Sequence, residues 1–191
     1  IETLEAMVDD DTVAILYNFP SNPTGATLDT QQRDELLAFA SRHGLWIISD
    51  EVYDRIVYDC DHVSFLGTGY EKLILVNSFS KTFAMTGWRI GYLLSTNIAA
   101  MQELIKLQYY ITACSNDAMQ YAVLEAFEVA NDYPEQMAIE FKARRDIICS
   151  RLNAIPGVSC HVPRGAFYVF PKVEVSGLTS EEVAIELLKG G

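Results

Sequence analysis

At residues 78–92 the chain contains the stretch SFSKTFAMTGWRIGY. This stretch comes directly after the apolar residues 73–76, which predict a buried strand. A lysine at the carboxyl end of a parallel strand lies where open α/β sheets bind ligands, and its amine can attach covalently to a carbonyl group. Lys81 also has hydroxyl and guanidinium neighbours that suit an anionic phosphate, namely Ser78, Ser80 and Arg89. We therefore expect a phosphate-bearing cofactor that is anchored to Lys81.

Two further polar motifs lie upstream, each at the end of a predicted strand. The apolar residues 13–17 lead into the loop NFPSNPTG at residues 18–25. The apolar residues 45–48 lead into SDEVY at residues 49–53. Because carboxyl ends of parallel strands meet at one edge of a sheet, these motifs and Lys81 are expected at a common edge.

The other elements are predicted from spacing and turn residues. Helical spacing predicts helices at residues 31–42, 99–111, 117–129, 134–152 and 180–189. Apolar or alternating runs predict additional strands at residues 88–94, 158–162 and 166–170. Gly44 is expected to end the first of these helices in the left-handed conformation, and Arg164 to lie exposed in a turn. The order of elements predicts a wound α/β layer with a mostly parallel sheet, followed by the start of a small α+β domain.

Length, charge and the lengths of apolar runs limit the classes of protein to which the chain can belong. The chain has 191 residues, half of them hydrophobic, which is enough for a sizeable core. It carries 14 Lys and Arg against 26 Asp and Glu, a net charge of −12, which opposes binding to nucleic acid or to anionic lipid. We find no apolar run long enough to cross a membrane and no signal segment, so a cytoplasmic protein is expected.

Cysteine and histidine usage gives no indication of a metal site. The scattered residues Cys60, Cys114, Cys149 and Cys160 lack the spacing of a zinc site or a disulfide scaffold, so free thiols are expected. The three histidines are likewise isolated from one another, and no metal is expected.

The three motifs SFSKTFAMTGWRIGY, NFPSNPTG and SDEVY together resemble class I/II aminotransferases, which use pyridoxal 5'-phosphate (PLP) and have the type I fold. The similarity runs from about Val13 to Tyr92 and continues more weakly to the segment GAFY at residues 165–168. It implies a three-layer α/β/α large domain over residues 1–130, with a connecting helix and part of a small domain over residues 131–191. Complete members of the family are longer, so we expect this chain to be a piece of one.

The resemblance also implies roles for individual residues. Lys81 would bind the cofactor covalently and move the proton, and Asp50 would keep the pyridine nitrogen protonated. Tyr53 and Asn22 would contact the cofactor's phenolic oxygen. The phosphate would be bound by Ser78, Ser80 and Arg89.

Several residues have plainer explanations. Glu51 and Asp54 are expected to be solvent-facing acids or to make contacts behind the site, without a catalytic role. Arg89 lies between apolar neighbours in a predicted strand, so a buried-edge partner is expected for its charge. In the family, residues near the dimer interface and active-site entrance correspond to Tyr109, Tyr110 and Thr112, but a packed helix face is the simpler interpretation.

The implied activity is transfer of an amino group between an amino acid and a 2-oxo acid. The same motifs occur in related PLP lyases, including carbon-sulfur lyases and aminocyclopropane-carboxylate-synthase-like enzymes, and in aminotransferase-like sensor domains of transcription regulators. A homodimer is expected for the intact protein. The glycine-rich phosphate-binding helix start and the ring-stacking aromatic of the family lie before Ile1, and its carboxylate-binding arginine lies beyond Gly191. The isolated chain is therefore expected to bind PLP weakly at most and to lack turnover, and the sequence does not indicate which amino acid is the substrate.

Overall fold

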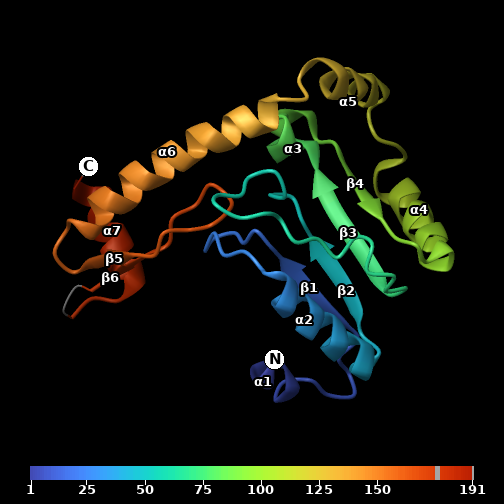
Figure 1. Cartoon of the computed structure of the whole chain (residues 1–191), viewed down its shortest axis with the longest axis horizontal. Helices are drawn as coiled ribbons and strands as arrows, with labels where there is room; N and C mark the ends of the chain where they lie inside the picture. Colours follow the sequence, from blue (N-terminus) through green and yellow to red (C-terminus); the bar gives the residue numbers. More distant parts are fainter. Residues whose placement is uncertain (175–176, 191) are drawn as a thin grey trace.

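The computed structural model describes residues 1–174 and 177–190 and contains one four-stranded sheet and one two-stranded sheet, with helices around them (Figure 1). The strands are β1 (Ala14–Asn18), β2 (Trp46–Asp50), β3 (Leu73–Ser78), β4 (Gly91–Leu94), β5 (Val158–Cys160) and β6 (Pro171–Val173). The α-helices are α1 (Glu2–Glu5), α2 (Thr30–His43), α3 (Phe79–Thr82), α4 (Ile98–Thr112), α5 (Asp117–Val129), α6 (Tyr133–Asn153) and α7 (Ser180–Gly190). A short 3₁₀ helix, η1, covers Thr86–Trp88.

The larger sheet has the strand order β1-β2-β3-β4. β1, β2 and β3 are parallel, whereas β4 is antiparallel to β3. Asn18 is paired with Asp50, and Asp50 with Val76, so the carboxyl ends of three neighbouring strands lie side by side. The predicted α/β class with a mostly parallel sheet is confirmed.

One face of this sheet is covered by α2 (Figure 1). A capping box starts this helix, because the Asp29 carboxylate accepts a hydrogen bond from the Gln32 N–H while the Gln32 side chain accepts one from the Asp29 N–H. Gly44 ends it at φ 64°, the predicted left-handed conformation. The core between helix and sheet consists of Tyr17, Leu36, Phe39, Ala40, Leu45, Ile47, Phe65 and Leu73. Burial of these side chains fixes the sheet on which the polar strand ends are presented.

The prediction of a strand over residues 88–94 was wrong at its amino end. Trp88 belongs to η1, and Arg89 adopts a left-handed φ of 52°. The Arg89 guanidinium donates from Nη1 to the Thr86 carbonyl at 2.9 Å, which closes this turn. β4 begins only at Gly91, where a Cβ would lie 2.6 Å from the Asn77 carbonyl oxygen. The glycine therefore permits the close approach of β4 to β3.

Helices α4, α5 and α6 lie within a residue of their predicted bounds. Pro134 occupies the first turn of α6, as expected from its fixed φ. The expected packing around Tyr109 and Tyr110 is wrong for this chain, since their exposures are 67% and 76%. No residue of α4 is buried.

The predicted strand over residues 166–170 was also wrong. Ala166 has a φ of 56°, which is incompatible with an extended strand, and its N–H donates to the Ile56 carbonyl at 2.9 Å. The chain pairs with β5 only later, through β6, in antiparallel register. Residues before β6 pack against the loop that follows β2 instead, as the bridge between Val57 and Gly165 shows.

A buried arginine connects α6 to the loop that follows β2 and to the residues that precede β6. Arg145 is 8% exposed and forms ion pairs with Asp146 at 2.7 Å and Asp59 at 3.3 Å. Its Nη1 donates to the Pro163 carbonyl at 3.0 Å, and its guanidinium lies 4.9 Å from the centre of the Tyr58 ring. The charge is thereby compensated on several sides, which offsets the cost of its burial.

The predicted free thiols are confirmed for Cys60, Cys114, Cys149 and Cys160. In the part of the chain that the structure describes, no helix combines the length and apolar character that a membrane crossing requires.

Candidate active site

Lys81 lies in the last turn of α3, directly after β3. Its Nζ atom is 5.8 Å from the centre of the Tyr53 ring and 5.0 Å from the centre of the Phe167 ring. Within residues 1–174 and 177–190 the amine has no carboxylate partner. Aromatic faces attract the lysine side chain without forming a hydrogen bond that occupies its nitrogen, so this amine is available for chemistry.

Tyr53 and Lys81 come together because both follow the carboxyl ends of neighbouring parallel strands. The Tyr53 ring is only 3% exposed and packs with Ile56, Tyr58 and Ala166. Its hydroxyl oxygen lies 2.6 Å from that of Tyr168. Burial raises the pKa of Tyr53, and the charge of Asp50 raises it further. The Tyr53 hydroxyl therefore stays protonated at neutral pH and can donate a hydrogen bond.

Asp50 ends β2, and its carboxylate accepts a hydrogen bond from the Val52 N–H at 3.2 Å. Asn18 at the end of β1 connects this strand end to the NFPSNPTG loop. Its Nδ2 donates to the Asp50 carbonyl at 3.3 Å, and its Oδ1 accepts from the Asn22 N–H at 2.7 Å. The Asn22 side chain is exposed. Sequence analysis missed Asn18, although its place as the last residue of a strand and the first of the motif was the available signal.

The three residues predicted to bind phosphate differ in their surroundings. Ser78 is the N-cap of α3: its Oγ accepts from the Ser80 N–H at 3.1 Å and donates to the Ile90 carbonyl at 3.2 Å. Ser80 is buried. Arg89 is exposed, so the expected buried-edge partner for its charge was wrong. The wrong strand boundary explains this error, because the apolar neighbours of Arg89 belong to a turn and not to a buried strand.

The NFPSNPTG loop packs directly against the turn that precedes GAFY. The Gly25 carbonyl accepts hydrogen bonds from the N–H groups of Arg164 at 3.1 Å and Gly165 at 2.9 Å. A Cβ on Gly25 would lie 2.3 Å from the Pro163 Cβ, and one on Gly165 would lie 2.6 Å from the Pro20 Cβ. These glycines permit a backbone contact that brings residues far apart in the sequence to the same site. The Arg164 side chain is exposed, as predicted.

A buried acid lies directly after Asp50. The Glu51 carboxylate accepts hydrogen bonds from the Ser49 hydroxyl at 2.8 Å and the Phe65 N–H at 3.1 Å, and lies 2.7 Å from His62 Nε2. Burial raises the pKa of Glu51, but these hydrogen bonds and one from Ser64 outweigh that effect, and the pKa lies below its ordinary value. Glu51 is 2% exposed, so the solvent-facing alternative was wrong for it and the contacts behind the site are what it makes.

Asp54 is half-buried in the same turn. Burial raises its pKa, and a hydrogen bond from the Asn77 side chain opposes this only in part. Its Oδ1 atom is buried and has no hydrogen-bond partner among the described residues. Burial therefore favours the protonated form of Asp54, whereas hydrogen bonds favour the charged form of Glu51.

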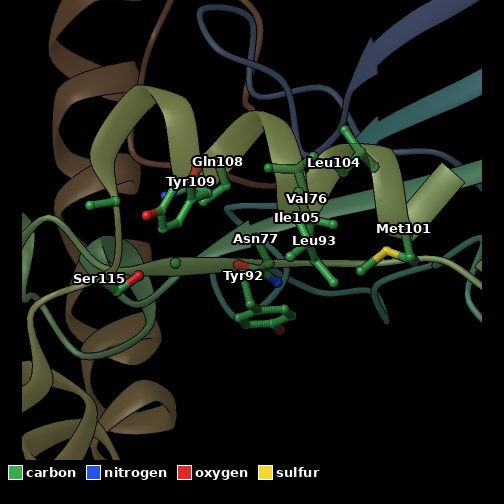
Figure 2. A pocket seen from close by; sticks show the side chains of 12 residues that line it. Val76, Asn77, Tyr92, Leu93, Met101, Leu104, Ile105, Gln108, Tyr109 and Ser115 are labelled. Atoms are coloured by element: carbon green, nitrogen blue, oxygen red, sulfur yellow. The ribbon is translucent and has the colours of Figure 1, made fainter.

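An apolar cavity of about 510 Å³ lies elsewhere, between α4 and strands β3 and β4 (Figure 2). Figure 2 shows Met101, Leu104 and Ile105 of α4 above Val76 and Leu93 of the sheet. Lys81, Asp50 and Tyr53 are not among its lining residues. The chemistry of the side chains, and not this cavity, therefore indicates the candidate active site. Among the described residues no cluster of His, Cys, Asp or Glu could hold a metal ion.

Comparison with known families agrees with the motifs. The model of the family described as aminotransferase class I and II matches residues 1–190. The chain belongs to the class I and II aminotransferase family. Aromatic-amino-acid aminotransferase 2 of Thermococcus litoralis is 37% identical over 194 residues, which cover 99% of this chain and 49% of the relative. An aspartate aminotransferase of Pyrococcus abyssi is 38% identical over 187 residues, which cover 95% and 48%. This aminotransferase chain thus spans about half the length of the curated relatives it matches.

Solved structures of aminotransferases have the same fold. The aromatic aminotransferase from Pyrococcus horikoshii OT3 superposes with a TM-score of 0.92 at 38% identity, covering 98% of this chain and 51% of that one. The aspartate aminotransferase from Thermotoga maritima gives a TM-score of 0.87 at 38% identity, covering 99% and 49%. The fold expected from the family resemblance is confirmed.

Proposed function

We propose that the protein carrying this chain is a PLP-dependent aminotransferase that transfers an amino group between an amino acid and a 2-oxo acid. The observation that carries the proposal is the position of the Lys81 amine beside the Tyr53 and Phe167 rings, at the sheet edge where Asp50 ends the neighbouring strand. Membership of the family supports it, as do the names of the relatives described above.

The side chains fit PLP by their chemistry. The Lys81 amine has no carboxylate partner among the described residues and lies next to the protonated phenol of Tyr53. The Asp50 carboxylate accepts a hydrogen bond from one backbone N–H. When bound, PLP supplies an electron sink for the carbanion that forms at the substrate α-carbon.

Each residue then has a distinct role. Asp50 favours a protonated pyridine nitrogen, because an adjacent carboxylate stabilises positive charge there. Tyr53 and Asn22 bind the phenolic oxygen. Lys81 holds the cofactor covalently and, when its amine is free, takes and returns the proton at the substrate α-carbon.

Phosphate binding is assigned to Ser78, Ser80 and Arg89. Their hydroxyl and guanidinium groups suit phosphate oxygens. Arg89 is exposed and has donors to spare beyond its bond to Thr86. The Ser78 hydroxyl has to exchange its bond to the Ile90 carbonyl for one to phosphate.

The amino acid is not specified by these residues. The names of the relatives include aspartate, aromatic amino acid and (5-formylfuran-3-yl)methyl phosphate as substrates of those proteins. We propose an amino acid and a 2-oxo acid as the substrate class, a homodimer as the assembly, and the cytoplasm as the location.

The test is a half-reaction on the full gene product loaded with PLP. An amino acid panel is added without an acceptor, and keto acid formation and the cofactor spectrum are followed together. The proposal requires stoichiometric keto acid and conversion of the cofactor to its pyridoxamine form. Release of ammonia, a thiol or a cyclised product without that conversion would establish a lyase instead. A DNA-binding segment in the full gene product together with no turnover would establish a sensor.

A further inference from the structure

We propose that Tyr168 is a positioning residue that directs the Tyr53 hydroxyl by donating a hydrogen bond to its oxygen. This inference rests on the proposed function, in which Tyr53 in turn donates to the phenolic oxygen of PLP. It assigns a role to a side chain that neither of the motifs around Asp50 and Lys81 contains.

The hydroxyl groups of Tyr53 and Tyr168 are in short contact, and Tyr53 is buried. Their hydroxyl oxygens are 2.6 Å apart, and their rings meet edge to face with centroids 5.7 Å apart. Tyr53 is 3% exposed and fixed by its packing, so its hydroxyl has little freedom to turn elsewhere. Tyr168 also packs against this cluster.

The backbone next to Tyr168 is held in place by three interactions. The Ala166 N–H donates to the Ile56 carbonyl at 2.9 Å, and the Tyr58 hydroxyl donates to the Ala166 carbonyl at 2.6 Å. The Tyr58 N–H donates to the Arg164 carbonyl at 2.7 Å, which completes the bridge between Val57 and Gly165. Tyr168 is therefore presented to Tyr53 from an anchored segment, as a positioning role requires.

The direction of the hydrogen bond follows from counting protons. Each phenol has one proton to donate, and Tyr53 uses its own on the ligand oxygen in the proposed function. The proton between the two hydroxyl groups must then come from Tyr168. A donor to the Tyr53 oxygen polarises its O–H bond and strengthens the bond that this hydroxyl makes next. The other charged groups that face Tyr53 are Asp50 and Lys81.

Tyr168→Phe therefore weakens donation by Tyr53 while keeping the ring that packs against it. A weaker donor stabilises the deprotonated form of the cofactor less, so the pKa of the cofactor rises. In the full gene product loaded with PLP, we expect the pH midpoint of the cofactor's visible absorption change to rise by about half a unit.

The matched control is Tyr70→Phe, which removes a hydroxyl that donates to the Leu45 carbonyl, away from Tyr53 and from the segment that carries Tyr168. Its midpoint should equal that of the wild type. In a Tyr53→Phe background, Tyr168→Phe should have no further effect, because the role of Tyr168 passes through the Tyr53 hydroxyl. Circular dichroism checks that every variant is folded.

The outcomes separate this inference from the proposed function. If the wild-type protein shows no covalent PLP spectrum, the proposed function fails. If PLP is bound and Tyr168→Phe has the wild-type midpoint, or if its shift persists in the Tyr53→Phe background, the positioning role is overturned and the proposed function stands. A shift of equal size in Tyr70→Phe also overturns the positioning role.

Discussion

His62 Nε2 lies 2.7 Å from the carboxylate of Glu51, one residue beyond the end of β2. The Glu51 carboxylate also accepts from the Phe65 N–H, so it joins the loop at residues 62–65 to the strand that ends at Asp50. A buried carboxylate with several donors is a strong constraint on the backbone around it. Glu51 therefore fixes the strand end from which Asp50 and Tyr53 project.

The first prediction concerns Glu51→Gln, which keeps the shape and removes the charge. The pKa of Glu51 in the folded protein is below the ordinary value of 4.5. The charge therefore stabilises the fold above pH 4.5, and this contribution is lost as the pH falls through the lower folded value. At pH 7 we expect the variant to lose about 2 kcal/mol of unfolding free energy, with a smaller difference once the pH falls below the folded pKa of Glu51. Urea denaturation at several pH values measures this, with Glu71→Gln on the exposed surface as the control. A difference that does not change with pH would contradict the assignment.

The second prediction concerns the amine. Lys81→Ala in the full gene product should lose transamination by about 100-fold or more, because both covalent binding and proton transfer depend on it. Borohydride reduction followed by mass spectrometry should find PLP on Lys81 in the wild type and not in the variant. Lys81→Arg keeps a positive charge beside the two rings and should fail equally. Turnover retained by Lys81→Arg would mean that the charge alone is required.

The third prediction compares two carboxyl groups of one turn. Asp50→Asn should reduce transamination by about 100-fold or more, since it removes the charge assigned to the pyridine nitrogen. Asp54→Asn should change the rate little, because Asp54 is not among the side chains assigned to the cofactor. Steady-state kinetics measure the transamination rates of both variants. Equal losses would show that the turn as a whole, and not the Asp50 charge, is required.

The fourth prediction concerns the contact between the NFPSNPTG loop and the turn before GAFY. Gly25→Ala introduces a Cβ at φ +67° and 2.3 Å from Pro163, and we expect a loss of about 2–4 kcal/mol of stability. Gly67→Ala is the matched control, since it has φ +83° but nothing within 4 Å, and should cost only about 1 kcal/mol. Thermal unfolding of both variants gives the difference that is due to the collision. Equal losses would show that backbone strain alone is responsible.

Local patterns predicted much of the fold and the position of the motifs. Apolar runs followed by polar residues located the carboxyl ends of β1, β2 and β3, because the period of a strand and its end are encoded in neighbouring residues. Lys81 was singled out by its place after a strand, and Asp50 and Tyr53 by the resemblance of the motifs to the family, although their proposed roles stay predictions.

Other features depend on contacts that no local pattern encodes. The hydroxyl contact between Tyr53 and Tyr168 joins residues 115 positions apart. Arg89 was misplaced because its apolar neighbours suggested a strand, whereas Trp88 is 52% exposed. The strand predicted at Ala166 fails because tertiary hydrogen bonds impose a left-handed φ there.

The anchoring of Pro163, Gly165 and Ala166 has a consequence for any swing of the C-terminal region. These residues are bound to Gly25, Ile56 and Tyr58 and also to α6 through Arg145. A hinge between the two sheets therefore cannot lie within this segment. The backbone has to bend on its far sides, between β5 and Pro163 and between Ala166 and β6. The aromatic pair Phe167 and Tyr168 begins directly at the second of these pivots.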